Sequence, residues 1–423
     1  MRDRSAPRSR RRFLAGLAAA FAAAGCGRRP PEPGTIRLWF TYGGNNRKVL
    51  LGLVDRFHRE QSAVRVEATF QGDYFEGLIK LRTGLFIDAV PTVSHVVGEV
   101  VPYLAAAGAL TPLDAIGSDT LASLVPALAQ PGTFLDADAQ PTWALPFNRS
   151  TPIAYYDKAL FAERGLAPPR TWQEMREVAR ALTERRGEET TRWGFECPID
   201  WWFWVAMVGQ AGGRVIEADG RVSLGGEAGL RAVDHWRAMI GEDRSMKPPP
   251  GRDFNAWEAT NSDFLARRVA MIWTSTAFLR YLEDNARFEV GCAPLPSDQR
   301  AAVPTGGTFF VIPRGIEGEE REAGLTFLRW MMQPAQANEW ATKTGYMPVS
   351  RPGYEALAAE GYYQTHPNDR VTLDQLAVAQ PWPWSTNLFR VQREAVQPRL
   401  EAAVRPDADP AALLAEARKA VPG

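Results

Sequence analysis

The stretch TIRLWFTYGGNNRKVLLGLVDRFHREQSAVRVEATF, Thr35 to Phe70, contains the pattern that determines the predicted fold class. Segments in which apolar and polar side chains alternate, as in a strand, are followed by segments in which apolar residues recur at helical spacing. The pattern continues beyond Phe70 and predicts strands at Thr35–Phe40, Val64–Phe70 and Thr92–Val97, with helices at Lys48–Glu60 and Tyr74–Thr83. A β-α-β-α-β order predicts the parallel sheet of an α/β protein, in which ligands bind at the carboxyl ends of the strands.

Length and composition narrow the class further. The chain has 423 residues, with 49 Lys and Arg against 49 Asp and Glu, and 45% of its residues are hydrophobic. This balance excludes intrinsic disorder and fibrous repeats. Because the chain exceeds the size at which one hydrophobic core stops growing, we expect two lobes with a cleft between them. The arginines alternate with acidic residues and form no long basic block, so we expect no nucleic-acid partner.

The first 25 residues have the features of an export signal. Arg10-Arg11-Arg12 leads into the apolar run Phe13 to Ala24, which is too short to span a bilayer. The paired arginines resemble a twin-arginine signal, and a generic basic segment is the alternative. We therefore expect residues 1–25 to be a signal peptide that exports the protein to the periplasm or the extracellular face.

A lipid-attachment motif follows the apolar run. Ala23-Ala24-Gly25-Cys26 resembles a lipobox, which predicts cleavage before Cys26 and a diacylglycerol on its thiol. Residues 26–34 contain three prolines and no periodicity, which predicts a stiff, extended tether. Since no other segment approaches transmembrane length, we expect the membrane contact to be through this N-terminal lipid only.

The later sequence continues to alternate strands and helices. We predict strands at Ile153–Tyr156, Val269–Trp273 and Pro304–Pro313, and a helix from the cap residue Thr171 to about Arg186. Trp201-Trp202-Phe203-Trp204 holds more tryptophan than one helix face can bury. We therefore expect at least one of these tryptophans to line the cleft.

Signatures of catalysis and of metal binding are missing from the sequence. It contains no His-Glu-x-x-His, no Gly-x-Ser-x-Gly and no Gly-rich phosphate or dinucleotide loop, and its four histidines are scattered. Tyr155-Tyr156 is better explained by strand packing than by ferric iron. We expect no metal, no cofactor and no enzymatic activity. Cys197 and Cys292 allow either a disulfide or two buried thiols.

Several motifs resemble those of extracellular solute-binding proteins of ABC importers. They are Leu145-Pro146-Phe147-Asn148, Tyr155-Tyr156-Asp157-Lys158, Thr171-Trp172 and Lys343 to Val349. The resemblance covers nearly the whole chain after the signal. It implies a type II periplasmic-binding-protein-like α/β fold, with two lobes around a ligand cleft joined by hinge segments. Residues 35–147 and 307–347 would form lobe 1, and residues 148–306 and 348–423 would form lobe 2.

A narrower resemblance is to members of that family that bind sn-glycerol 3-phosphate or glycerophosphodiesters. It rests on Gly72-Asp73-Tyr74, Pro146 to Pro152, Thr305-Gly306-Gly307 and Leu388 to Val391. The ligand-binding residues that it implies are Tyr74, Ser150, Ser275, Gly307, Tyr346 and Arg390. An arginine forks onto two phosphate oxygens, and neutral hydroxyls and an amide donate the other hydrogen bonds, so such a site needs no metal.

Two positions depart from the family pattern where a headgroup would lie. Gly98 stands at the place of an acidic residue, and we expect the adjacent Glu99 to replace it. The family's tryptophan loop aligns only approximately with Trp201 and Trp202, which we include in the site. Tryptophan faces and a carboxylate attract a quaternary ammonium, which makes glycerophosphocholine a candidate ligand beside glycerol 3-phosphate.

The resemblance implies a substrate-binding lipoprotein, which we expect to be a monomer, that closes over its ligand by a hinge and delivers it to the permease subunits of an ABC importer. An oligosaccharide-binding protein of the same fold is the first alternative, with the tryptophans stacked on sugar rings and Arg390 in a structural ion pair. An exported phosphodiester hydrolase ranks lower, since it requires a metal cluster or a nucleophile with its base. A scaffold lipoprotein without a ligand would leave the cleft motifs unexplained.

Overall fold

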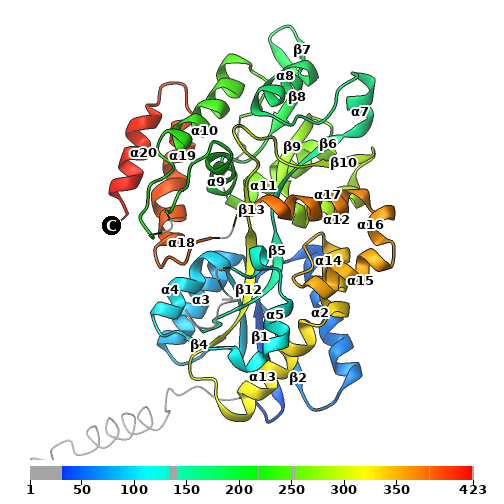
Figure 1. The fold of residues 1–423 in the computed structure, drawn as a ribbon, viewed down its shortest axis with the longest axis vertical. Coiled ribbons are helices and arrows are strands. Elements are labelled where there is room, and N and C mark those ends of the chain that lie inside the picture. The colour runs from blue at the N-terminus through cyan, green and yellow to red at the C-terminus, as the bar shows by residue number, and fades with distance from the viewer. Residues whose placement is uncertain are drawn as a thin grey trace, which may run out of the picture.

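The computed structural model describes residues 31–130, 132, 141–217, 219–248, 251, 253–380 and 382–421. The predicted signal peptide, the predicted lipid site Cys26 and the start of the predicted tether lie outside the described residues. The described chain forms two lobes, one above the other in Figure 1. No helix in this part is long and apolar enough to cross a membrane.

The lower lobe in Figure 1 is built on a sheet with strand order β2-β1-β3-β12-β4, and β5 pairs with β12. Its strands are β1 (Thr35–Phe40), β2 (Arg65–Phe70), β3 (Val93–Val97), β4 (Leu110–Thr111), β5 (Leu145–Ser150) and β12 (Gly306–Pro313). β1 is parallel to β2 and β3, which confirms the predicted β-α-β-α-β order. β12 runs antiparallel to β3, β4 and β5.

Helices cover the faces of this sheet. α2 (Gly44–Glu60) buries Leu50, Leu53, Val54 and Phe57, which form one apolar stripe at helical spacing. The other helices are α3 (Tyr74–Phe86), α4 (Val101–Ala106), α5 (Ser118–Ser123), α6 (Pro126–Ala129), α13 (Gly318–Met331), α14 (Pro334–Thr344) and α15 (Arg351–Ala359), with 3₁₀ turns η1 (Gly98–Val100) and η2 (Asp114–Ile116).

The upper lobe contains a second sheet with strand order β10-β6-β9-β8-β7. Its strands are β6 (Pro152–Asp157), β7 (Glu184–Arg186), β8 (Glu189–Glu196), β9 (Val269–Ser275) and β10 (Val290–Ala293). β8 and β9 are parallel and the other pairs are antiparallel. A short parallel pair, β11 (Val303–Pro304) with β13 (Ala379–Gln380), lies between this sheet and the junction of the lobes.

The remaining helices belong mostly to the upper lobe (Figure 1). They are α7 (Lys158–Glu163), α8 (Trp172–Leu182), α9 (Trp201–Gln210), α10 (Glu227–Arg237), α11 (Asp253–Leu265), α12 (Leu279–Asn285), α16 (Tyr362–Thr365), α17 (Pro367–Gln375), α18 (Leu388–Arg390), α19 (Gln397–Ala403) and α20 (Pro410–Lys419), with the π-helical segments η3 (Ala238–Glu242) and η6 (Val391–Val396) and the 3₁₀ turns η4 (Thr276–Phe278) and η5 (Leu376–Val378).

One predicted helix ends earlier than expected. Thr171 caps α8 as predicted, because its hydroxyl accepts a hydrogen bond from Glu174 N at 3.1 Å. The prediction that this helix reaches Arg186 is wrong, since Glu184–Arg186 forms β7 on the edge of β8. The Thr183 hydroxyl accepts from Gly194 N at 3.0 Å, so bonds to the neighbouring strand replace those of a last helical turn.

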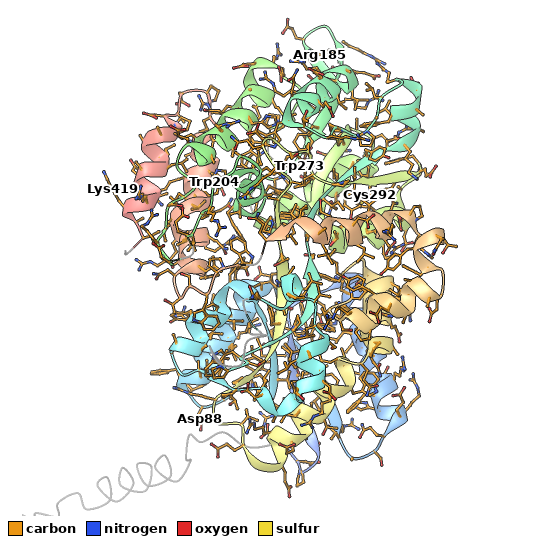
Figure 2. All side chains as sticks on the ribbon, viewed as in Figure 1. Asp88, Arg185, Trp204, Trp273, Cys292 and Lys419 are labelled. Carbon is orange, nitrogen blue, oxygen red and sulfur yellow. The ribbon has the colours of Figure 1, made fainter. Side chains whose placement is uncertain are left out.

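Buried side chains form separate clusters in the two lobes. One cluster joins residues from Ile36 to Phe147 with residues from Phe309 to Val349. The other clusters lie above it and include Trp204 and Trp273, which Figure 2 labels inside the upper lobe. The lobe boundaries stay a prediction, and α15, which that prediction assigns to lobe 2, packs against α14 of the lower lobe.

Three stretches of chain meet at the junction of the lobes. β5 and β12 pass through it side by side, and their pairing ends where Ser150 lies opposite Gly306 (Figure 1). The third stretch joins them at Met347, whose backbone N donates to the Arg149 carbonyl at 3.0 Å. A change in the angle between the lobes would therefore act on these residues.

Candidate functional site

The start of β12 places a glycine turn at the junction. Gly307 has φ +98°, and a Cβ built there would lie 1.8 Å from the Asn148 carbonyl oxygen. Only glycine fits this approach of the two strands without a shift of the backbone. The predicted site residues Ser150 and Gly307 are therefore brought together, since Ser150 pairs with Gly306 at the end of β5.

Two predicted tyrosines meet beside this turn. Tyr74 begins α3 directly after the cap residue Asp73, and Tyr346 follows Gly345, the left-handed residue that ends α14. Their hydroxyl oxygens lie 3.4 Å apart, and Asn148 Nδ2 donates to Tyr74 Oη at 3.4 Å. Burial raises the pKa of both phenols, so they remain neutral hydroxyls at physiological pH.

Tyr346 is held from behind by stacked rings. Its ring lies parallel to that of Trp340, with centroids 5.6 Å apart and an interplanar angle of 14°. Trp340 in turn stacks on Phe147 at 4.5 Å, and Phe147 packs against Phe310 of β12. The orientation of Tyr346 is thus fixed by the aromatic core of the lower lobe.

Ser275 approaches the same place from the upper lobe. Ser275 ends β9 opposite Pro152, which follows Ser150 by two residues. The Ser275 hydroxyl accepts a hydrogen bond from Ala277 N at 3.1 Å. Tyr155 donates its hydroxyl to the Ser275 carbonyl at 3.1 Å and is fully buried, which supports the packing interpretation of the tyrosine pair.

Glu99 lies in η1 at the carboxyl end of β3, where the parallel sheet predicts a ligand. The side chain of Glu99 is buried, and burial raises its pKa to about 7. A hydrogen bond from its own backbone N–H and the charge of Arg149 lower the pKa, but by less than burial raises it. The negative charge of Asp200 raises the pKa further. Glu99 is therefore a carboxyl group that changes charge near neutral pH.

The tryptophans at the start of α9 face the junction. Trp202 packs on Gly306, where an added Cβ would lie 2.8 Å from its ring, and donates Nε1 to Thr305 O at 3.4 Å. Trp382 donates to the same carbonyl at 2.8 Å and packs against Trp201, with ring centroids 5.5 Å apart. Trp201 remains half-buried, whereas Trp204 is enclosed in the core.

Arg390 is placed at the rim of this group. It lies on α18, which packs against η1, the turn that carries Glu99. Its side chain is 49% exposed, and its Nε lies 3.2 Å from Glu394 Oε2 on the next helical turn. Its neighbour Phe389 packs against Phe75 of α3, so this segment of the upper lobe reaches the lower lobe.

Three further residues lie among the predicted site residues but were not predicted individually. Asn148 and Arg149 lie within the motif that carries the family resemblance, and each bonds to β12. Trp382 lies in the segment Trp382-Pro383-Trp384, whose two tryptophans pack against different lobes. The clustering of Trp and Pro near the C-terminus was the sequence signal for Trp382.

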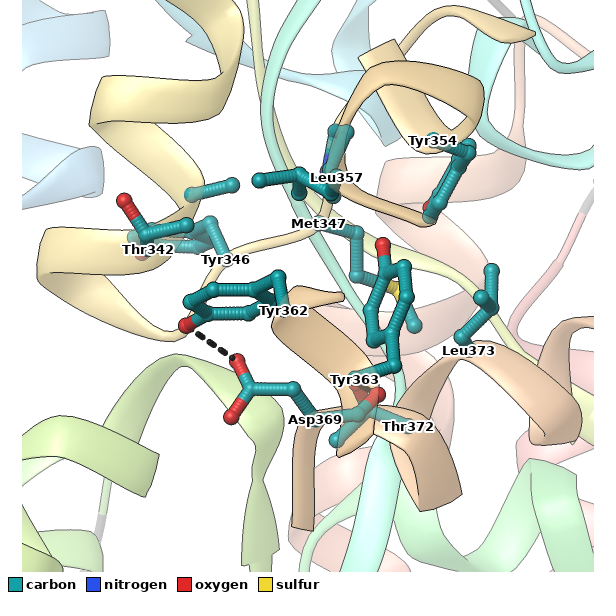
Figure 3. A pocket seen from close by; sticks show the side chains of 12 residues that line it. Thr342, Tyr346, Met347, Tyr354, Leu357, Tyr362, Tyr363, Asp369, Thr372 and Leu373 are labelled. Carbon is teal, nitrogen blue, oxygen red and sulfur yellow. Dashed lines mark hydrogen bonds between the residues drawn. The ribbon is translucent and has the colours of Figure 1, made fainter. Parts of the chain in front are cut away.

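A separate shallow pocket borders the other side of Tyr346 (Figure 3). α14, α15, α16 and α17 form it, and its lining is mostly apolar and tyrosine side chains. Tyr362 donates its hydroxyl to Asp369 at 3.2 Å there. Since Asp369 is the one charged residue among the lining residues described, this pocket does not suit an anion.

The described residues contain no cluster of three or more His, Cys, Asp or Glu that would hold a metal. His95 is buried among aromatic rings, and burial lowers its pKa to about 3. Cys197 and Cys292 are both buried free thiols, which decides between the two possibilities that the sequence left open.

The fold and the site at the junction are those of a two-lobed ligand-binding protein. The chain belongs to the bacterial extracellular solute-binding protein family, whose model matches residues 52–406. This confirms the predicted family and makes the chain a solute-binding protein of the ABC-importer type.

Three relatives with known names or structures share about a quarter of their residues with this chain. The sn-glycerol-3-phosphate-binding periplasmic protein UgpB of Pectobacterium atrosepticum is 23% identical over 374 residues, which cover 84% of this chain and 82% of that protein. The structure of UgpB from Mycobacterium tuberculosis in complex with glycerophosphocholine is 25% identical, with a TM-score of 0.79 over 91% of this chain and 97% of the other. A cyclic alpha-maltosyl-1,6-maltose binding protein from Arthrobacter globiformis is 24% identical, with a TM-score of 0.74 over 92% and 98%. The type II fold predicted for the chain is therefore confirmed.

Proposed function

We propose that this protein captures sn-glycerol 3-phosphate or a glycerophosphodiester such as glycerophosphocholine and delivers it to the permease of an ABC importer. The observation that carries the proposal is the convergence of neutral donors at the lobe junction. Ser150, the Gly307 turn and the paired hydroxyls of Tyr74 and Tyr346 come from different stretches of chain and meet there. Relatives named for these ligands support it.

A phosphate would be held by these donors and by Arg390. Phenol hydroxyls, serine hydroxyls and a backbone N–H each donate to an anionic oxygen without a metal. Arg390 lies on α18 beside η1 and is exposed, so its guanidinium is available to leave Glu394 and fork onto the phosphate as the lobes close. The hinge segments are those where β5, β12 and Met347 meet.

The aromatic side of the site suits a choline headgroup. Half-buried Trp201 packs against buried Trp382, and the carboxyl group of Glu99 lies on the turn that faces α18. A quaternary ammonium is attracted to tryptophan faces and to a carboxylate. These groups give glycerophosphocholine more contacts than glycerol 3-phosphate alone would make.

The second candidate is an oligosaccharide. The relative from Arthrobacter globiformis is named for a maltose derivative, and the tryptophans of this site would stack equally well on sugar rings. If the ligand is an oligosaccharide, Arg390 is expected to form a structural ion pair, and it pairs with Glu394. Hydrolysis of a phosphodiester has no support from the described side chains, so we propose binding without catalysis.

We propose further that the protein is an exported monomeric lipoprotein. Cys26 would carry the lipid, and residues 27–34 would link it to β1. The partners would be the transmembrane permease subunits, which the lobes contact in their closed form.

Calorimetry on the purified protein, refolded to remove bound ligand, tests the ligand class. We expect binding of glycerol 3-phosphate and glycerophosphocholine and none of maltose. Arg390→Ala is expected to weaken binding of both phosphate ligands about tenfold or more, the usual loss for hydrogen bonds to a charged group. The control is Arg418→Ala on α20, which removes the same charge from an exposed surface. Binding of maltose alone, unchanged by Arg390→Ala, would reject the phosphate ligand and leave the family standing.

Trp201→Ala tests the headgroup contact separately. We expect it to weaken glycerophosphocholine binding about fivefold, the scale of a cation–π contact, and to leave glycerol 3-phosphate binding unchanged. Glycerol 3-phosphate thus serves as the control on the same variant. An equal loss for both ligands would show that Trp201 supports the site rather than the headgroup.

A further inference from the structure

A single arginine lies buried at the point where the three stretches of chain meet. The side chain of Arg149 is 1% exposed, and it makes four hydrogen bonds, all to uncharged oxygens. Nε donates to Leu128 O at 2.9 Å and Nη1 to Gly307 O at 3.0 Å. Nη2 donates to Gln130 O at 3.4 Å and to Thr305 Oγ1 at 3.0 Å. Arg149 thus ties α6 and the start of β12 to β5.

The positive charge of this guanidinium has no paired negative charge. Among the described residues, no carboxylate forms an ion pair with Arg149, and the carboxylate whose charge acts on it is Glu99. Cζ of Arg149 lies over the Phe309 ring, 4.4 Å from the ring centroid. Burial lowers the pKa of Arg149 to about 10, so the group stays charged at neutral pH. A buried charge without an ion-pair partner is costly, and an anion bound nearby would offset part of that cost.

The position of Arg149 indicates which counter-ion that is. Arg149 directly precedes Ser150, and its Nη1 donates to the carbonyl of Gly307. Ser150 and Gly307 both belong to the candidate phosphate site. A Cβ built on Gly98 would lie 3.4 Å from Nη1, so the guanidinium also lies against the turn that carries Glu99. Its charge acts on the hydroxyls of Tyr74 and Tyr346 as well. The charge therefore lies behind the candidate donors at the lobe junction.

From this geometry we infer that Arg149 is a specificity-determining residue, whose buried positive charge makes the cleft prefer an anionic ligand without touching it. The inference rests on the proposed function, in which the ligand carries a phosphate. Charges attract over several ångströms inside a protein because its interior screens them less than water does. The hydrogen bonds to four neutral oxygens fix the guanidinium behind the site. The ligand phosphate would supply a full negative charge where the free protein has only the partly ionised carboxyl group of Glu99.

Paired variants separate this role of the charge from that of a structural clamp. Arg149→Gln removes the charge, whereas Arg149→Lys keeps a charge but loses most of the four hydrogen bonds. At pH 6, where a buried lysine keeps its proton more readily, we expect Arg149→Gln to weaken glycerol 3-phosphate binding about tenfold and Arg149→Lys to weaken it less than about threefold. Thr305→Val is the matched control, since it removes one bond of the clamp and leaves the charge.

Each outcome decides the inference. Equal weakening by Arg149→Gln and Arg149→Lys, or by Thr305→Val, would show that the clamp matters and the charge does not. Unchanged binding by Arg149→Gln would overturn the inference as well. Circular dichroism shows whether Arg149→Gln folds. If it does not, the Arg149→Lys variant decides: tenfold weaker binding of glycerol 3-phosphate overturns the inference. Binding by Arg149→Lys within threefold of the unmodified protein supports it. Failure of the unmodified protein to bind any phosphate ligand would instead reject the proposed function, and the inference with it.

Discussion

Replacement of Gly307 by alanine is expected to lower the free energy of unfolding by about 3 kcal/mol, the sum of left-handed backbone strain and overpacking. The new Cβ would lie 1.8 Å from the Asn148 carbonyl oxygen, at a residue with φ +98°. Relief of this overlap requires β5 and β12 to separate where Arg149 and Ser150 hold the junction. Because the same shift displaces the Gly307 N–H, we also expect binding of glycerol 3-phosphate to weaken about tenfold or more.

Gly108→Ala provides the matched control. Gly108 also has positive φ, +61°, but a Cβ there has no heavy atom within 4 Å. It therefore measures backbone strain alone, for which we expect about 1 kcal/mol and no change in binding. Urea unfolding and calorimetry on the two variants provide the measurements. A Gly307→Ala protein as stable as Gly108→Ala, with unchanged binding, would show that the close approach of β5 and β12 is not required.

Most of the fold was predictable because local patterns determine it. The apolar stripe of α2 and the alternation of β1 indicate their structures without any information from distant residues. The end of α8 was not predictable in this way. Thr183 and the residues after it pair with β8, a contact that the helical propensity of residues 183–186 does not reveal.

The site was predictable as a set of residues but not as an arrangement. The family motifs led to Tyr74 and Tyr346, which lie 272 positions apart in the sequence and whose hydroxyls meet. Nothing in the motif distinguished Arg149 from the polar residues around it. Its importance comes from burial among uncharged oxygens, which depends on how β5, β12 and α6 pack.

The buried carboxyl group of Glu99 makes stability depend on pH. In the folded protein its pKa lies near 7, raised by burial from an ordinary value of 4.5. The folded state therefore binds more protons than the unfolded state between these two values. Under this linkage stability falls as pH rises, so the contribution of the neutral carboxyl is fully present below pH 4.5 and is lost as pH passes 7.

Glu99→Gln is expected to remove this loss. Gln keeps the shape of a neutral carboxyl group, so we expect the variant and the unmodified protein to have similar stability at pH 4.5. At pH 8 the variant is expected to be more stable by about 3 kcal/mol, from 1.36 kcal/mol for each pKa unit. Urea unfolding at the two pH values measures the difference, with Glu355→Gln on the exposed face of α15 as the control. A variant that is less stable at pH 8 would show that ionised Glu99 is needed as the counter-charge of Arg149, and that this attraction exceeds the cost of burial.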